Sequence, residues 1–149
     1  MLSVKRSVVM LLMLGFVLLN LVGETRKELI DNLYEEIFVN VESREFDAVD
    51  YFPHADGVLV FYFKNKSEVY VKALFFASLY QLQYYVNVTE SAIEGYCEKI
   101  QYESPYKLEG SVKNYEGDFR FEKNRIKNAG NSFEEKLSFV IMEILKKEF

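Results

Sequence analysis

The sequence has no tryptophan, and only one cysteine, one histidine and two prolines among its 149 residues. Because Cys97 is alone, no disulfide can form within the chain, and the fold must depend on its core. The lone His54 leaves no second imidazole for a zinc site, and any Ser–His or Cys–His pair would have to use it. The chain also lacks the Gly-x-Gly-x-x-Gly, phosphate-loop and Gly-x-Ser-x-Gly motifs. It therefore indicates no catalytic, cofactor-binding or metal-binding residue.

Charge is absent from the 17 residues Ser7 to Gly23, which follow Lys5 and Arg6. Such a run just reaches the length that a membrane-spanning helix needs, and it has no polar face to meet water, which disfavours a buried helix of a soluble protein. A cleaved signal peptide is the alternative, although no small-x-small triplet offers a cleavage site. We therefore expect residues 1–23 to be a signal-anchor or transmembrane segment that contacts the membrane through residues 7–23.

The flanking positive charges predict that the N-terminus stays inside and that residues 24–149 form a single extracytoplasmic domain at the cell membrane. If the segment is cleaved, this domain is secreted. Two Asn-x-Ser/Thr triplets, at Asn65 and Asn87, could carry glycans only if the domain faces out, and the sequence leaves their glycosylation open.

Basic residues are too few and too scattered for a nucleic-acid partner. Residues 24–103 hold 15 acidic and 7 basic side chains, a net charge of −8, and residues 104–149 hold 8 and 9, a net charge of +1. Nucleic-acid binding needs clustered Lys and Arg that displace counterions. We therefore expect no nucleic-acid partner.

The pattern of apolar residues predicts an α+β fold with an antiparallel sheet packed by helices. Residues 65–88 stay open between a third strand at Glu68–Lys72 and a helix capped by Ser67, with Ala73–Leu82 helix-like in either case. Around them we expect a helix at 24–41, strands at 46–52 and 58–64 joined by an Asp56-Gly57 turn, a helix from the capping box Ser91–Glu94 to Gln101, an antiparallel pair at 106–113 and 118–126, and a C-terminal helix that begins with the capping box Ser132–Glu135.

Three groups of side chains were weighed as sites. The first group holds three aspartates and the histidine, whose oxygen and imidazole atoms could bind a divalent cation. These residues are spread over a predicted strand and a turn and do not have the spacing of a known metal-binding motif, so we interpret them as turn residues. Cys97 lies on an apolar stripe and should be buried. Six tyrosines could line an adhesive surface or, as we favour, lie at the edge of the core. The cation candidates are Asp47, Asp50, His54 and Asp56, and the tyrosines are Tyr80, Tyr84, Tyr85, Tyr96, Tyr102 and Tyr106.

The predicted order of helix, hairpin, apolar helix, strands and C-terminal helix resembles the small profilin-like modules of the roadblock and longin types. A second outline, an apolar N-terminal helix continued by an amphipathic helix and a sheet, resembles type IV pilin subunits, although Ser7 follows Arg6 where prepilin processing expects Gly or Ala. Both outlines imply binding or assembly. We expect a membrane-anchored, non-catalytic domain that binds another protein or its own copy. The alternatives are a pilin-like structural subunit and a carboxylate- or metal-dependent enzyme.

Overall fold

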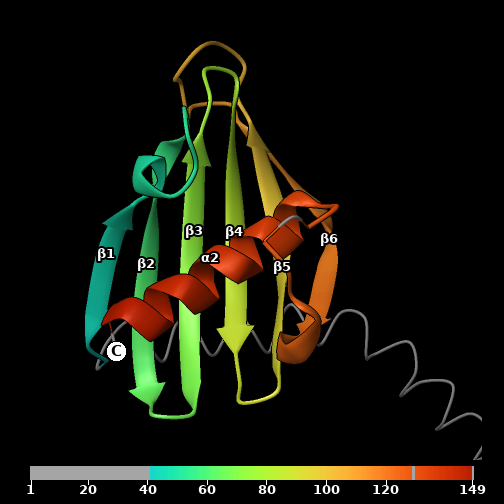
Figure 1. Cartoon of the computed structure of the whole chain (residues 1–149). Coiled ribbons are helices and arrows are strands. Elements are labelled where there is room, and N and C mark those ends of the chain that lie inside the picture. The colour runs from blue at the N-terminus through green and yellow to red at the C-terminus, as the bar shows by residue number, and fades with distance from the viewer. Residues whose placement is uncertain (1–40, 129, 149) are drawn as a thin grey trace, which may run out of the picture. The chain divides into compact units, whose positions relative to one another are not determined.

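The computed structural model describes residues 41–128 and 130–148 (Figure 1). The expected membrane segment at 7–23, and all but the last residue of the expected helix at 24–41, lie outside these described residues. Within the described part of the chain, no helix is long and apolar enough to cross a membrane.

Six strands form one antiparallel sheet in which each strand pairs with its neighbour in the chain. Residues on successive strands share a row, so that Leu59 lies opposite Ala73, Ala73 opposite Tyr84, and Tyr84 opposite Cys97. The elements are β1 (Ser43–Asp47), the 3₁₀ turn η1 (Ala48–Asp50), β2 (Asp56–Asn65), β3 (Glu68–Phe76), β4 (Tyr80–Val88), β5 (Ala92–Gln101), β6 (Val112–Glu122), the 3₁₀ turn η2 (Lys123–Arg125) and α2 (Phe133–Glu148).

The core lies between one face of this sheet and α2, which crosses that face diagonally (Figure 1). The inward row of each strand is apolar because alternate residues of a strand point to the same face. Three fully buried aliphatic side chains of α2 pack against this row, namely Leu137, Ile141 and Ile144. Burial of this apolar surface is what joins the helix to the sheet.

The C-terminal helix confirms the sequence prediction, including half of its capping box. The backbone amide of Glu135 donates a hydrogen bond of 3.2 Å to the hydroxyl of Ser132, as the motif requires. The carboxylate of Glu135 accepts from the amide of Asn131, also at 3.2 Å, one residue earlier than the motif expects. Lys146 and Lys147 lie in the last turn, where positive charge complements the helix dipole.

The prediction of a central helix at Ala73–Leu82 was wrong. Of the two alternatives left open for residues 65–88, the strand is the one observed, but it continues to Phe76, and β4 begins at Tyr80. Tyr70 and Val71 are both fully buried although they point to opposite faces of β3. A strand buried on both faces has a continuous apolar sequence, and such a sequence cannot be told from a buried helix by its periodicity.

The prediction of a helix at Ser91–Gln101 was also wrong, because this segment is β5. The hydroxyl that organises the preceding turn belongs to Thr89, which accepts a hydrogen bond of 3.3 Å from the amide of Ala92. A capping-box sequence stabilises a helix only where no stronger tertiary pairing competes for the segment. Here β5 pairs along its whole length with both β4 and β6.

The prediction of an antiparallel pair at 106–113 and 118–126 was wrong, because residues 112–122 form the single strand β6 and residues 106–111 belong to the loop before it. Instead of a turn at Asn114–Gly117, the register slips by one residue, since Cys97 lies opposite Gly117 and Glu98 opposite Tyr115. This is a β-bulge, and Gly117 has the positive φ of 133° that such an irregularity accommodates.

The first hairpin also differs from its prediction. β1 ends at Asp47, and η1 follows directly after it. Asp56 and Gly57 are the first residues of β2 and do not form a tight turn. The described residues place no helix between β2 and β6, so the fold lacks the apolar helix that the profilin-like outline requires. The structure is an antiparallel six-stranded sheet with one α-helix, at the C-terminal end of the described part of the chain.

Candidate functional site

The four cation candidates from the sequence do not converge. Asp47 precedes η1 and Asp50 is its last residue, His54 lies in the following turn with a φ of 67°, and Asp56 begins β2. All four are exposed. Among the described residues, no group of three or more His, Cys, Asp or Glu side chains is close enough to hold a metal ion.

The six tyrosines considered from the sequence do not form one surface either. Three are buried, namely Tyr84, Tyr96 and Tyr102. Tyr84 lies in the core under α2, whereas Tyr85 and Tyr96 stack at 5.0 Å between ring centroids on the opposite face of the sheet. Tyr80 and Tyr106 are exposed. Of the six, Tyr85 alone is partly buried, as a residue at the edge of the core would be, and the two exposed rings belong to a different feature.

That feature is an exposed apolar cluster at one end of the sheet. It is built from the β3–β4 turn and the loop between β5 and β6, which lie together at the top of the molecule (Figure 1). Tyr106 and Leu108 are 72% and 63% exposed, the two highest values among the large apolar side chains of the described residues. We call this cluster the apolar tip, and its members are Phe76, Leu79, Tyr80, Tyr106, Leu108 and Val112.

Backbone hydrogen bonds hold the two segments of the apolar tip together. The amide of Tyr102 donates to the carbonyl of Leu79 at 2.8 Å, and the amide of Tyr106 donates to the carbonyl of Ser78 at 2.9 Å. Tyr106 has a φ of 58°, which is uncommon for a residue other than glycine. The loop is thus tied to the turn at two points while its largest ring faces solvent.

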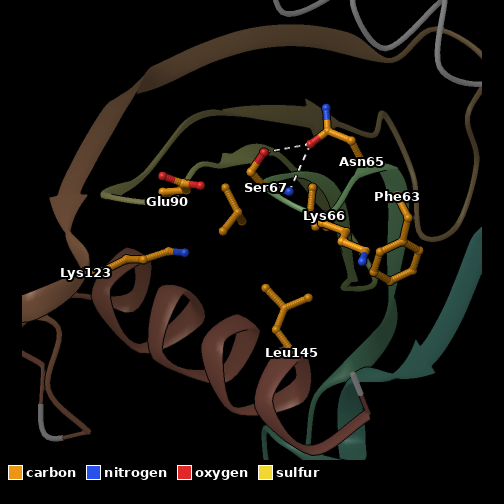
Figure 2. Close-up of a pocket in the computed structure, with 9 residues that line it drawn as sticks. Phe63, Asn65, Lys66, Ser67, Glu90, Lys123 and Leu145 are labelled. Carbon is orange, nitrogen blue, oxygen red and sulfur yellow. Dashed lines mark hydrogen bonds between the residues drawn. The ribbon is translucent and has the colours of Figure 1, made fainter.

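A second feature, a pocket, lies at the opposite end of the sheet, between the sheet and α2 (Figure 2). Its volume is about 750 Å³, within the range typical of ligand-binding pockets. Apolar side chains from four elements line it, namely Phe63, Val69, Val88 and Leu145. Its polar lining residues are Asn65, Lys66, Ser67, Glu90 and Lys123.

Local hydrogen bonds shape the walls of the pocket. The side-chain oxygen of Asn65 accepts bonds from the amide and the hydroxyl of Ser67, at 2.9 and 3.0 Å, which closes the β2–β3 turn. On the other side, the amide of Lys123 donates to the carbonyl of Ser91 at 2.9 Å and ties η2 to the β4–β5 turn. Figure 2 shows Lys123 extending from that side into the cavity, with Leu145 below it.

The face of the sheet opposite α2 carries an ion pair between a buried carboxylate and an exposed lysine, which the sequence did not predict. Glu98 is 1% exposed, and the amine of Lys113 lies 2.6 Å from its carboxylate. Burial and the nearby Lys113 lower the pKa of Lys72, against the opposing effect of Glu98. The pair connects β5 to β6 beside the bulge. Only the strand pairing could have revealed it, because Glu98 was assigned to a helix.

Cys97 is buried, as predicted, with 5% of its surface exposed. It lies in the core, where burial raises the pKa of its thiol to about 11. The thiol is therefore neutral at physiological pH. Because the thiolate is the reactive form, nothing in this environment activates Cys97 as a nucleophile.

The raised pKa of Cys97 predicts a loss of stability in alkali. The unfolded thiol ionises near pH 8.5, roughly its ordinary value. The folded state holds the proton more tightly, so the stabilising contribution is complete below that pH and is lost as the pH rises through about 11. The unfolding temperature of the full chain, followed by circular dichroism in a mild detergent, should fall between pH 9 and 11 more steeply than that of Cys97→Ala.

From about pH 10 upward, which overlaps this range, Tyr70 and Tyr84 add to the same trend, because burial is the main cause that raises the pKa of each phenol. The Cys97→Ala chain keeps both tyrosines and is the matched control. Equal slopes for the two chains between pH 9 and 11 would contradict the prediction.

Comparison with protein-family models, with curated proteins and with solved structures finds no significant match to this chain.

Proposed function

We propose that this protein is a non-catalytic binding domain, anchored in the membrane by residues 7–23, that contacts another protein or a second copy of itself through the apolar tip. The observation that carries the proposal is the exposure of six large apolar side chains in the β3–β4 turn, in the β5–β6 loop and at the adjoining strand ends. Contiguous exposed apolar patches mark interaction sites, and aromatic residues are enriched in the buried centres of protein interfaces. A domain facing away from the cell would present this surface to extracytoplasmic partners.

The composition of the apolar tip suits a protein partner. Tyr80 and Tyr106 each combine an apolar ring with a hydroxyl that can donate a hydrogen bond at the edge of a contact. The amine of Lys99 lies 4.5 Å from the centre of the Tyr80 ring, so a cation borders the apolar surface. An apolar centre with a polar edge is the usual arrangement of a protein–protein interface.

The pilin-like structural subunit and the carboxylate- or metal-dependent enzyme remain the alternative proposals. A pilin-like subunit would also use apolar contacts between copies of the chain. The mass of the complex therefore distinguishes self-assembly from binding to a different protein. The enzyme would require acidic side chains to converge, and the four candidates of the sequence analysis lie apart in exposed positions.

A photo-cross-linking amino acid placed at Leu108 in the full-length, membrane-inserted chain should give a cross-linked product. The same amino acid at Glu143, which is exposed on α2, is the control and should give none. Tyr106→Ser in the Leu108 chain should reduce the yield about tenfold, because an aromatic anchor commonly contributes 1–2 kcal/mol or more, and about 1.4 kcal/mol is a factor of ten.

The mass of the product identifies the partner. A product of twice the chain mass indicates a second copy, and any other mass indicates a different protein. Absence of a product at Leu108, or a yield that Tyr106→Ser leaves unchanged, would contradict the proposed use of the apolar tip.

A further inference from the structure

The pocket at the other end of the sheet has no part in the proposed function of the apolar tip. β3 alone, with nine residues, separates the two features by roughly 30 Å. We propose that this pocket binds an amphiphile that has one anionic head group and an unbranched apolar tail, a long-chain carboxylate being the simplest member of that class.

The apolar side of the pocket is a continuous row across three strands. Phe63 pairs with Val69, and Val69 pairs with Val88, so their side chains lie side by side on the face that α2 covers. Leu145 reaches the same space from the last turns of α2. A flexible hydrocarbon tail seated there would remove apolar surface from water on both molecules, which favours binding.

The polar lining of the pocket carries two positive charges and one negative charge. Lys66 lies in the β2–β3 turn and Lys123 begins η2, and they stand on opposite sides of the cavity in Figure 2. Neither amine has a carboxylate within 4 Å among the described residues. By contrast, Lys64 and Lys146 each form an ion pair, with Glu68 and Glu143 respectively, at 3.6 Å between the amine and a carboxylate oxygen.

These charges define the head group. The two unpaired amines together with Glu90 give a net charge of +1, which matches a single carboxylate. A doubly charged phosphate would leave one negative charge uncompensated and would approach the Glu90 carboxylate. The backbone amide and the hydroxyl of Ser67 are already used in the turn, because both donate to the side-chain oxygen of Asn65. Charge attraction, and not a set of directed hydrogen bonds, would therefore hold the head.

The test uses the full chain in nanodiscs of zwitterionic lipid and a tetradecanoate that carries a photoreactive diazirine in mid-chain. After irradiation, peptide mapping by mass spectrometry should find the label on peptides that contain Val69, Val88 or Leu145. The double variant Lys66→Met/Lys123→Met should lower that labelling about tenfold, since it keeps the apolar stems and removes both charges. The Lys107→Met chain, changed in the loop at the opposite end, should be labelled as the wild type.

Two further measurements distinguish the effect of the lysine charges from a loss of folding and from binding by the apolar tail alone. Lys66→Arg/Lys123→Arg should restore labelling, which a loss of folding in the Met variant would not predict. The corresponding alcohol, which has the same tail without charge, should label the wild type and the Met variant equally. Label confined to residues outside the pocket, or labelling by the carboxylate that the Met variant leaves unchanged, would overturn the proposal. Neither result would affect cross-linking at Leu108, so the two proposals fail separately.

Discussion

Gly95→Ala is expected to unfold much of the protein, because a Cβ atom at this position has no room. An ideal Cβ on Gly95 would lie 2.1 Å from the carbonyl oxygen of Tyr85 and 3.0 Å from the Cα of Val86, both on the backbone of β4. The ring of Phe119 on β6 closes the remaining side at 3.1 Å. A backbone obstacle cannot rotate away as a side chain can, so the central pairing of β4 with β5 would have to separate.

We expect the substitution to lower the free energy of unfolding by at least about 3 kcal/mol, the upper part of the range for overpacked cores. Against a total stability of roughly 5–15 kcal/mol, this is a severe loss. Thermal unfolding of the full chain in a mild detergent, followed by circular dichroism, measures it. Ser91→Ala, in the exposed turn of the same hairpin, is the control and should change stability by less than about 0.5 kcal/mol. Wild-type stability of the Gly95→Ala chain would show that the two strands can move apart without cost.

Ile141→Ala should produce the second large effect, a loss of about 3 kcal/mol within the range of 2–5 kcal/mol for such truncations. Ile141 is fully buried in the contact between α2 and the sheet, where Leu137 and Ile144 flank it on the same side of the helix. Removing its branched side chain would forfeit the apolar surface and leave a cavity that neighbouring side chains fill only in part.

Glu143→Ala is the matched control for Ile141→Ala, since Glu143 lies two residues further along α2 and is exposed. Its pair with Lys146, at 3.6 Å, is a surface pair that contributes 0–1 kcal/mol in typical cases. Denaturant titration of both chains under the same conditions gives the comparison. Equal and small effects would mean that α2 contributes little to the core.

The apolar tip and the pocket were largely beyond prediction from the sequence. Tyr80 and Tyr106 were considered as part of a longer tyrosine set, but their partners Phe76, Leu79 and Leu108 were not, because Phe76 and Leu79 were assigned to a buried helix. A large apolar residue in a turn between two strands is recognisable as exposed only after both strands are known. The pocket joins β2, β3, β4, η2 and α2, and no local pattern brings such distant segments together.

The sequence by itself determined the elements whose information is local. The period of apolar residues and the cap at Ser132 define α2, whose hydrogen bonds lie within a few residues of one another. Residues 65–88 stay open between a strand and a helix in the sequence, and only the pairing of β3 decides for the strand. The burial of Cys97 was also predictable, because an apolar neighbourhood in sequence remains apolar in a strand as in a helix.

Only the tertiary structure decided the rest of the sheet. The apolar run Ala73–Leu82 has a helix-like signal but forms the end of β3, a turn and the start of β4. The capping-box sequence at Ser91 likewise precedes the strand β5. All three segments, β3, β4 and β5, became strands because each pairs on both sides. β6 continues through a turn-like sequence as a bulge, beside the buried contact of Glu98 with Lys113. The hydrogen bonds of a sheet connect residues far apart in the chain, so their combined free energy overrides local preference and cannot be read from any one segment.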